Sequence, residues 1–128
     1  MRVTRVYVDK MGESHFDEHV VALAAAGSIN SLSDRIAAEA VVFRETEAGY
    51  DYDWHVAPER QFIVMLDGNV EIWVSDGSRR TFGGGDVLLM EQTTARGHRS
   101  RHTKMQTRRS VFTVLGEVAP TGVEERST

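Results

Sequence analysis

The chain has 128 residues, a length that suits one domain with a single hydrophobic core. Hydrophobic residues make up 41% of it and charged residues 27%, as in most globular proteins, and no apolar run approaches the roughly 18 residues of a membrane span. The net charge of −4 argues against a general nucleic-acid binder, and a chain without cysteine has neither disulfides nor thiolate chemistry.

Short segments with alternating or β-branched residues predict strands along most of the chain. In chain order we expect strands at residues 2–8, 38–46, 60–66, 70–75, 79–82, 87–90, 98–105 and 110–116. Residues 20–26 are ambiguous, because their alanines tolerate a helix that the following glycine would stop, and residues 27–34 and 49–58 are predicted loops. Many short strands indicate a sandwich or a barrel, so we expect one all-β domain over residues 1–128, with a frayed polar tail from Pro120.

The clearest hairpin joins residues 60–66 to residues 70–75. Between them, Asp67 and Gly68 supply the positive φ that a tight hairpin turn needs. The first strand is apolar on both faces apart from Gln61, whereas a strand covered on one face alternates with polar residues. Something therefore covers each face, and because so short a chain has little structure to spare for this, we expect a homodimer.

A glycine–histidine spacing overlaps the start of this hairpin. Gly49 is followed by five residues and then His55, and Gln61 is followed by six residues and then Gly68. This spacing resembles the first motif of the cupin superfamily, the small jelly-roll barrels. Two ligand positions of the family depart from it, because Ala57 stands where a second histidine is expected and Gln61 where a glutamate is expected.

The second cupin motif is matched more loosely. A triple glycine at 83–85 leads into the apolar residues 87–90, as in the family. Arg96 falls where the motif has its histidine, and His98 follows two residues later, with the same in–out parity along a strand. The resemblance covers about residues 38–116 and implies a cupin double-stranded β-helix, an RmlC-like jelly-roll barrel whose core is formed by these residues.

The resemblance implies a site inside the barrel, built on His55 and His98. Two imidazoles and one oxygen ligand can hold a divalent transition metal such as iron, zinc, manganese, nickel or copper, and Gln61 would supply the oxygen. His102 shares the parity of His98 and would add a third imidazole. The alternative is that the histidines donate and accept hydrogen bonds in a polar interior without a metal.

Four further residues are expected to bind the substrate: Tyr52, Trp54, Met65 and Arg96. By strand alternation, the two aromatic residues share a face with each other but not with His55, and they form a pocket wall or pack a loop onto the barrel. Residues 92–116 contain six basic residues and no acidic residue, which predicts an electropositive rim that attracts an anionic molecule, or else a solvated strand pair with outward arginines.

Three functions are open at this point. The first is an isomerase, lyase, cyclase or dioxygenase that acts on a small, anionic organic substrate, with His55 and His98 as catalytic residues that hold the metal. The second is metal-free acid–base catalysis or ligand binding in the same cavity. The third is a non-catalytic binding module. Because the first residues lack the apolar core of a signal peptide, we expect a cytoplasmic protein without a membrane or nucleic-acid partner.

Overall fold

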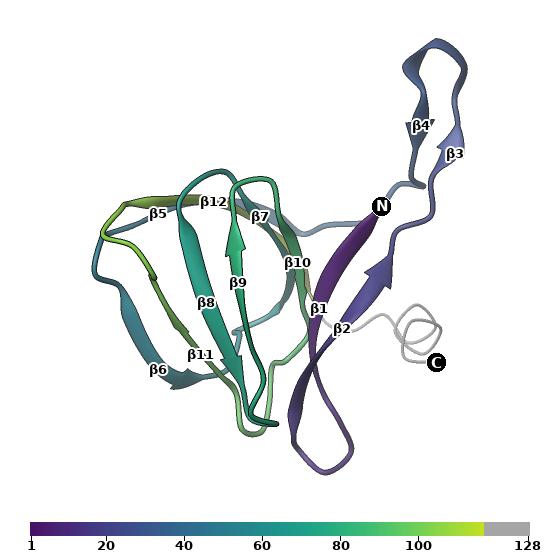
Figure 1. The fold of residues 1–128 in the computed structure, drawn as a ribbon. Helices are drawn as coiled ribbons and strands as arrows, with labels where there is room; N and C mark the ends of the chain where they lie inside the picture. Colours follow the sequence, from purple (N-terminus) through teal and green to yellow (C-terminus); the bar gives the residue numbers. More distant parts are fainter. Residues whose placement is uncertain (117–128) are drawn as a thin grey trace.

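The computed structural model describes residues 1–116, which fold almost entirely into strands (Figure 1). In chain order the strands are β1 (Arg2–Val8), β2 (Ser14–Val20), β3 (Ala24–Ala25), β4 (Ser31–Leu32), β5 (Ala40–Thr46), β6 (Asp51–His55), β7 (Arg60–Met65), β8 (Asn69–Val74), β9 (Arg79–Gly83), β10 (Val87–Met90), β11 (His98–Arg101) and β12 (Arg108–Gly116). A turn of 3-10 helix, η1 (Gly27–Ile29), separates β3 from β4. Within this part of the chain no helix is long and apolar enough to cross a membrane, and the predicted tail from Pro120 lies outside the described residues.

Most strands belong to two sheets that face one another (Figure 1). The six-stranded sheet has the order β2-β1-β10-β7-β12-β5, and the four-stranded sheet has the order β6-β11-β8-β9. Apart from the parallel pair of β1 and β10, neighbouring strands in both sheets are antiparallel. The fold is therefore the predicted all-β jelly roll, and β1 and β2 extend its larger sheet beyond the predicted core at 38–116.

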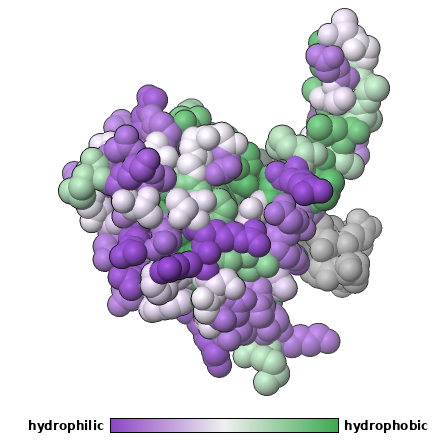
Figure 2. Space-filling model, viewed as in Figure 1, coloured by the Kyte–Doolittle hydropathy of each residue, from purple (hydrophilic) through white to green (hydrophobic). Residues whose placement is uncertain are grey.

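Apolar side chains from the inner faces of both sheets form the core. On β8 the alternate residues Val70, Ile72 and Val74 point inward, and on the opposite sheet Leu88 and Met90 of β10 do the same. The outer surface over β8, β9 and β11 is mostly hydrophilic (Figure 2), as expected for sheets packed on one face. The inner faces thus supply one continuous core, and part of the space between the sheets remains open as a cavity.

Several predicted elements need correction. Residues 51–55, predicted as part of a loop, form β6, because they pair with β11 although none of them is β-branched. The strand predicted at 98–105 ends at Arg101, and β2, which was not predicted, pairs with β1 over seven residues. The predicted loop at 27–34 contains η1 and β4. β6 pairs with a segment distant in sequence, whereas β2 and β4 each pair with the strand that precedes them.

The turn predicted at Asp67 and Gly68 is present, but the predicted hairpin is wrong. β7 lies in the six-stranded sheet and β8 in the four-stranded sheet, so the turn carries the chain from one sheet to the other. Gly68 has φ +70°, and a Cβ at this position would meet the backbone of Arg108 at 2.9 Å, so a side chain is excluded both by conformation and by space. Asp67 accepts hydrogen bonds from the backbone N–H and the Nε of Arg109 at 2.8 and 2.6 Å. The turn is thereby fastened to the start of β12, whose side chains line the cavity.

An arm made of β3, η1 and β4 projects from the two packed sheets (Figure 1). Its two strands pair through only two residues each, and its apolar side chains Leu23, Ile29 and Leu32 are exposed. A two-stranded ribbon without a packed face is marginally stable in water. The arm is therefore the least supported part of the described chain.

Candidate functional site

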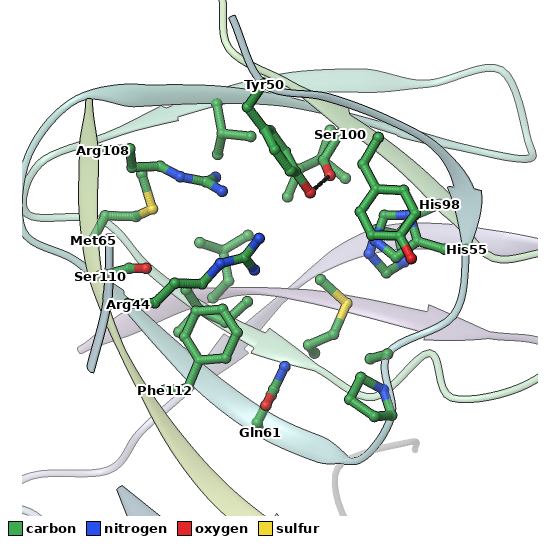
Figure 3. A pocket seen from close by; sticks show the side chains of 18 of the residues that line it. Arg44, Tyr50, His55, Gln61, Met65, His98, Ser100, Arg108, Ser110 and Phe112 are labelled. Carbon is green, nitrogen blue, oxygen red and sulfur yellow. Dashed lines mark hydrogen bonds between the residues drawn. The ribbon is translucent and has the colours of Figure 1, made fainter. Parts of the chain in front are cut away.

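A cavity of about 410 Å³ lies between the two sheets (Figure 3). This volume is within the range of small-molecule sites, which is roughly 300–1,000 Å³. Much of the lining is apolar, and it includes Ile63, Met65, Val70, Ile72, Leu88, Met90 and Phe112. The polar lining comes from Arg44, Tyr50, Tyr52, His55, Gln61, His98, Ser100, Arg108 and Ser110. No Asp or Glu of residues 1–116 is among the lining residues.

His55 and His98 are brought together on one side of this cavity. They come from the end of β6 and the start of β11, where the two residues are directly paired across the strands. Their ring centroids are 4.3 Å apart and the rings are tilted by 57°. Residues 43 positions apart in sequence thus form one imidazole pair facing the cavity.

Hydrogen bonds fix the orientation of both imidazoles. The Nδ1 of His55 lies 2.7 Å from the backbone carbonyl oxygen of Asp53, and the Nδ1 of His98 lies 3.0 Å from the Oε1 of Gln92. Gln92 is itself oriented, because its amide nitrogen donates to the carbonyl of Thr94. Since both oxygens are acceptors, each Nδ1 carries the hydrogen in the neutral ring. The Nε2 of each ring is then left with a lone pair.

The two histidines differ in their surroundings. His98 is buried, with 5% of its surface exposed, whereas His55 is half-buried. Burial, together with the charge of the neighbouring His55, lowers the pKa of His98 to about 3. His98 is therefore neutral at physiological pH, and its Nε2 accepts hydrogen bonds.

Tyr52 stacks on His55, with ring centroids 3.9 Å apart. The predicted face assignment is wrong here, because Tyr52 lines the cavity together with His55. A β-bulge explains the difference. His98 pairs with His55 but Ser100 pairs with Tyr52, so β6 carries one residue more than β11 over this interval. The extra residue changes the in–out alternation, and Trp54, which is 45% exposed, is not among the lining residues.

Two arginines form a second polar region of the cavity, away from the histidines in Figure 3. Arg44 of β5 pairs in register with Ser110 of β12, and Arg108 lies two residues before Ser110 on the same face. Both guanidinium groups lie over the ring of Tyr50, at 5.6 and 5.2 Å from its centroid. Tyr50 also shares a 2.9 Å hydrogen bond with Ser100. Sequence reasoning did not select either arginine.

The predicted site residues fall into two groups. Gln61 and Met65 line the cavity with the histidines and Tyr52. Arg96 and His102 are not lining residues. The guanidinium of Arg96 is exposed and forms a 2.7 Å ion pair with Glu13, so it does not take the anion-binding position predicted for it.

His102 packs on Tyr50, a residue of the cavity lining, but does not line the cavity itself. The two ring centroids are 5.3 Å apart, and both ring nitrogens of His102 are buried without a hydrogen-bond partner. Burial lowers its pKa, and the positive charge of Arg108 acts in the same direction. With the ring of Tyr50 as its neighbour rather than His55 or His98, His102 does not extend the imidazole pair into a triad.

The residues present do not fit a complete catalytic metal site. Such sites usually have three protein ligands. Residues 1–116 contain no group of three or more His, Cys, Asp or Glu side chains placed to hold a metal. What remains is two imidazoles and the amide of Gln61, whose oxygen carries no charge to offset a cation. The metal therefore remains a prediction.

Comparison with known proteins adds information on the fold. No protein-family model matches the sequence, and no curated protein does. The cupin domain of Cnp3 from Schizosaccharomyces pombe superimposes with a TM-score of 0.53 at 12% identity, over 99% of this chain and 92% of that one. A DUF861 family protein from Thermotoga maritima matches at 22% identity and a TM-score of 0.45, over 57% of this chain and 76% of its own. A conserved protein of unknown function from Streptococcus pyogenes matches at 16% identity and a TM-score of 0.46, and the match spans 62% of this chain and 65% of that protein.

The two facing sheets and the cavity between them define a jelly-roll domain with an internal cavity. The chain has the cupin fold, as the superposition on the Cnp3 domain over nearly its whole length shows. At this level of identity the likeness establishes the fold alone. Because one fold hosts many chemistries, the function must be argued from the site.

Proposed function

We propose that this chain is a small-molecule enzyme of the isomerase or lyase kind, which moves a proton on an organic substrate held in the cavity. The observation that carries this proposal is the His55–His98 pair, 4.3 Å apart, with both Nδ1 atoms occupied by fixed acceptors. Each ring then offers one defined polar atom, Nε2, to a substrate. Two oriented imidazoles in a mostly apolar pocket suit general acid–base chemistry.

The two imidazoles would have different roles. An imidazole whose pKa is about 3 holds a proton too weakly to act as a general base near neutral pH, so His98 is the hydrogen-bond acceptor that positions the substrate. His55 is the proposed acid–base residue. Stacking on Tyr52 and the hydrogen bond to the Asp53 carbonyl hold its ring in place while a proton moves at Nε2. Gln61 supplies amide N–H donors for a substrate oxygen.

A metal-dependent reaction is the second candidate. Histidines that bind metals usually donate their other ring N–H to a carbonyl or carboxylate oxygen, as both Nδ1 atoms do here. His55, His98 and Gln61 would be the ligands, and the metal would act as a Lewis acid. The first candidate is preferred, because these three residues fall short of the ligand set of a catalytic metal site.

Proton exchange into small carbonyl compounds tests the proposal. The purified protein is incubated in D2O with a panel of oxo acids and uncharged ketones, and loss of the C–H signal next to the carbonyl is followed by NMR. We expect exchange with at least one compound, and a decrease of about 10²–10⁴-fold in His55→Ala. His15→Ala is the matched control, because His15 is not a lining residue and pairs with Asp9 and Asp76 instead.

The same assay separates the two candidates. If exchange survives prolonged dialysis against a chelator, the metal-free reaction is supported. If the chelator abolishes exchange and zinc or manganese restores it, with stoichiometric metal by elemental analysis, the second candidate replaces the first. If no compound exchanges, or if His55→Ala exchanges like the unchanged protein, the proposed acid–base function is wrong and a binding module remains.

A further inference from the structure

Arg44 and Arg108 place two positive charges in a cavity whose described lining contains no carboxylate. They come from neighbouring strands, β5 and β12, and their side chains extend toward the middle of the cavity in Figure 3. Arg108 is 7% exposed and Arg44 is half-buried. A buried cation is unfavourable unless a negative charge or several acceptors compensate it.

Other buried arginines of this protein have such partners. Arg5 forms ion pairs with Asp17 and Glu91, and Arg60 forms one with Glu91. Within residues 1–116, neither Arg44 nor Arg108 has a carboxylate within ion-pair distance. The fold therefore pairs its other buried arginines with carboxylates and leaves these two, both of which line the cavity, with the ring of Tyr50 and without a carboxylate partner.

Unused hydrogen-bond donors gather at the same place. The Nε of Arg108 and the hydroxyl of Ser110 are buried and have no hydrogen-bond partner. Ser110 is 2% exposed and lies directly opposite Arg44 across the β5–β12 pair. Burial lowers the pKa of Arg108 and the charge of Arg44 adds to this effect, while Tyr50 opposes it. Two guanidinium groups and a hydroxyl in one corner match the acceptors of an oxyanion.

We propose that the cavity selects organic molecules with an anionic group, a carboxylate or a phosphate, and holds that group between Arg44 and Arg108. This inference rests on the proposed function, since it assigns the substrate class of the same cavity. The anionic group lies at the arginine region and the reacting part of the molecule lies at His55 and His98. Apolar side chains of the same cavity lining, including Ile63, Met65 and Phe112, contact the body of the ligand.

Binding of simple probes tests the inference. Benzoate and phenylphosphonate carry the two anions on the same ring, and benzamide is the uncharged isostere of benzoate. With the unchanged protein, calorimetry or NMR titration should show benzoate or phenylphosphonate binding at least tenfold more tightly than benzamide. Which of the two anions binds more tightly identifies the carboxylate or the phosphate as the preferred group. This comparison needs no variant, so it does not depend on folding.

Substitutions locate the binding. Arg44→Gln and Arg108→Gln should each weaken binding of the preferred anion at least tenfold, and Arg108→Lys should retain part of it. Arg109→Gln is the matched control, because Arg109 is the next residue and loses the same charge, but its guanidinium is exposed and pairs with Asp67. If Arg108→Gln does not fold, Arg44→Gln shows whether the arginine region binds the anion, since Arg44 is less buried and its substitution disturbs the fold less.

Three results would overturn the inference: benzamide binds as tightly as benzoate, neither anion binds at millimolar concentration, or both glutamine variants bind the anion unchanged. The outcome is separable from that of the proposed function. Proton exchange confined to uncharged ketones would refute the anion selectivity but not the acid–base role of His55. Arginine-dependent anion binding without any proton exchange would refute the acid–base role but not the selectivity.

Discussion

Gly97 lies directly against the backbone of His55. A Cβ at Gly97 would collide with the His55 carbonyl oxygen and stand 2.8 Å from its carbonyl carbon, and Gly97 has φ +79°. The backbone of the residue before His98 therefore packs on the backbone of His55, and this close approach brings the two imidazoles together. Only glycine meets both requirements, because any side chain would collide and would also strain this conformation.

Gly97→Ala should therefore separate the imidazole pair. We expect a loss of at least about 1–3 kcal/mol in the free energy of unfolding from the left-handed conformation, and a further loss from displacement of β6. Gly77→Ala is the matched control, because Gly77 has φ +94° but a Cβ added there would meet no heavy atom within 4 Å. Urea unfolding measures both variants. If Gly97→Ala and Gly77→Ala lose the same free energy of unfolding, the close contact of Gly97 with His55 contributes nothing to stability.

Acid pH should destabilise the protein through His98. Its pKa is about 3 in the folded state and 6.5 as its ordinary value, so between these values the unfolded chain binds a proton that the folded chain excludes. Above pH 6.5, protonation of His98 takes nothing from the free energy of unfolding. Below pH 6.5 the free energy of unfolding falls by about 1.4 kcal/mol per pH unit, until the folded-state pKa is reached. Acid therefore favours unfolding at this residue.

A comparison with His98→Gln isolates this effect from that of the carboxylates. Between about pH 7 and about pH 5, the unchanged protein should lose roughly 2 kcal/mol more stability than the variant, as measured by urea unfolding. Parallel pH profiles of the two proteins would mean that His98 becomes protonated in the folded state as readily as in the unfolded chain.

Glu91 compensates two buried arginines on the side of β10 that faces away from the core. Its carboxylate lies 2.5 Å from Arg60 and 3.4 Å from Arg5, and its side chain is 7% exposed. Removal of one partner from a buried pair leaves an uncompensated charge, so Glu91→Ala should destabilise the protein by about 3–5 kcal/mol. Glu18→Ala, which breaks the exposed 3.8 Å pair with Arg80, should cost about 0–1 kcal/mol. Similar losses in urea unfolding of the two variants would contradict the distinction between buried and surface pairs.

The local parts of the fold were predictable from sequence. Gly68 predicted a turn because glycine tolerates a positive φ, and Gly68 has φ +70°. That this turn joins the two sheets instead of closing a hairpin depends on the pairing of β7 and β8 with other strands. β6 was not predictable in this way, because its acidic and aromatic residues become a strand by pairing with β11. The bulge in β6, which turns Tyr52 toward His55, likewise depends on the register between two distant segments.

In the candidate site, too, some residues could be predicted from local sequence and others depend on strand pairing. The motif spacing selected His55. His98 was selected because it keeps the in–out parity of the motif position that Arg96 occupies, two residues earlier. Arg44 and Arg108 were missed, because their inward direction follows from the pairing of β5 with β12, which sequence alternation cannot supply. The run of basic residues at 92–116 was the available signal, but it led to Arg96, which lies in the turn before β11 and pairs with Glu13 at the surface.

The homodimer remains a prediction, and β5 is the surface on which we expect it to form. β5 is the edge strand of the larger sheet, and its apolar residues are exposed on both faces: Val41 by 58%, Val42 by 47% and Phe43 by 79%. An apolar edge with unpaired backbone groups readily pairs with another chain.

Light scattering after gel filtration should therefore give twice the mass of the chain, and Phe43→Glu should shift the equilibrium toward the monomer. Met11→Glu is the control, because Met11 is 84% exposed in the turn between β1 and β2, at the other end of the sheet order. A monomer at every concentration would show that β5 has another role, and equal dissociation of the two variants would place the interface elsewhere.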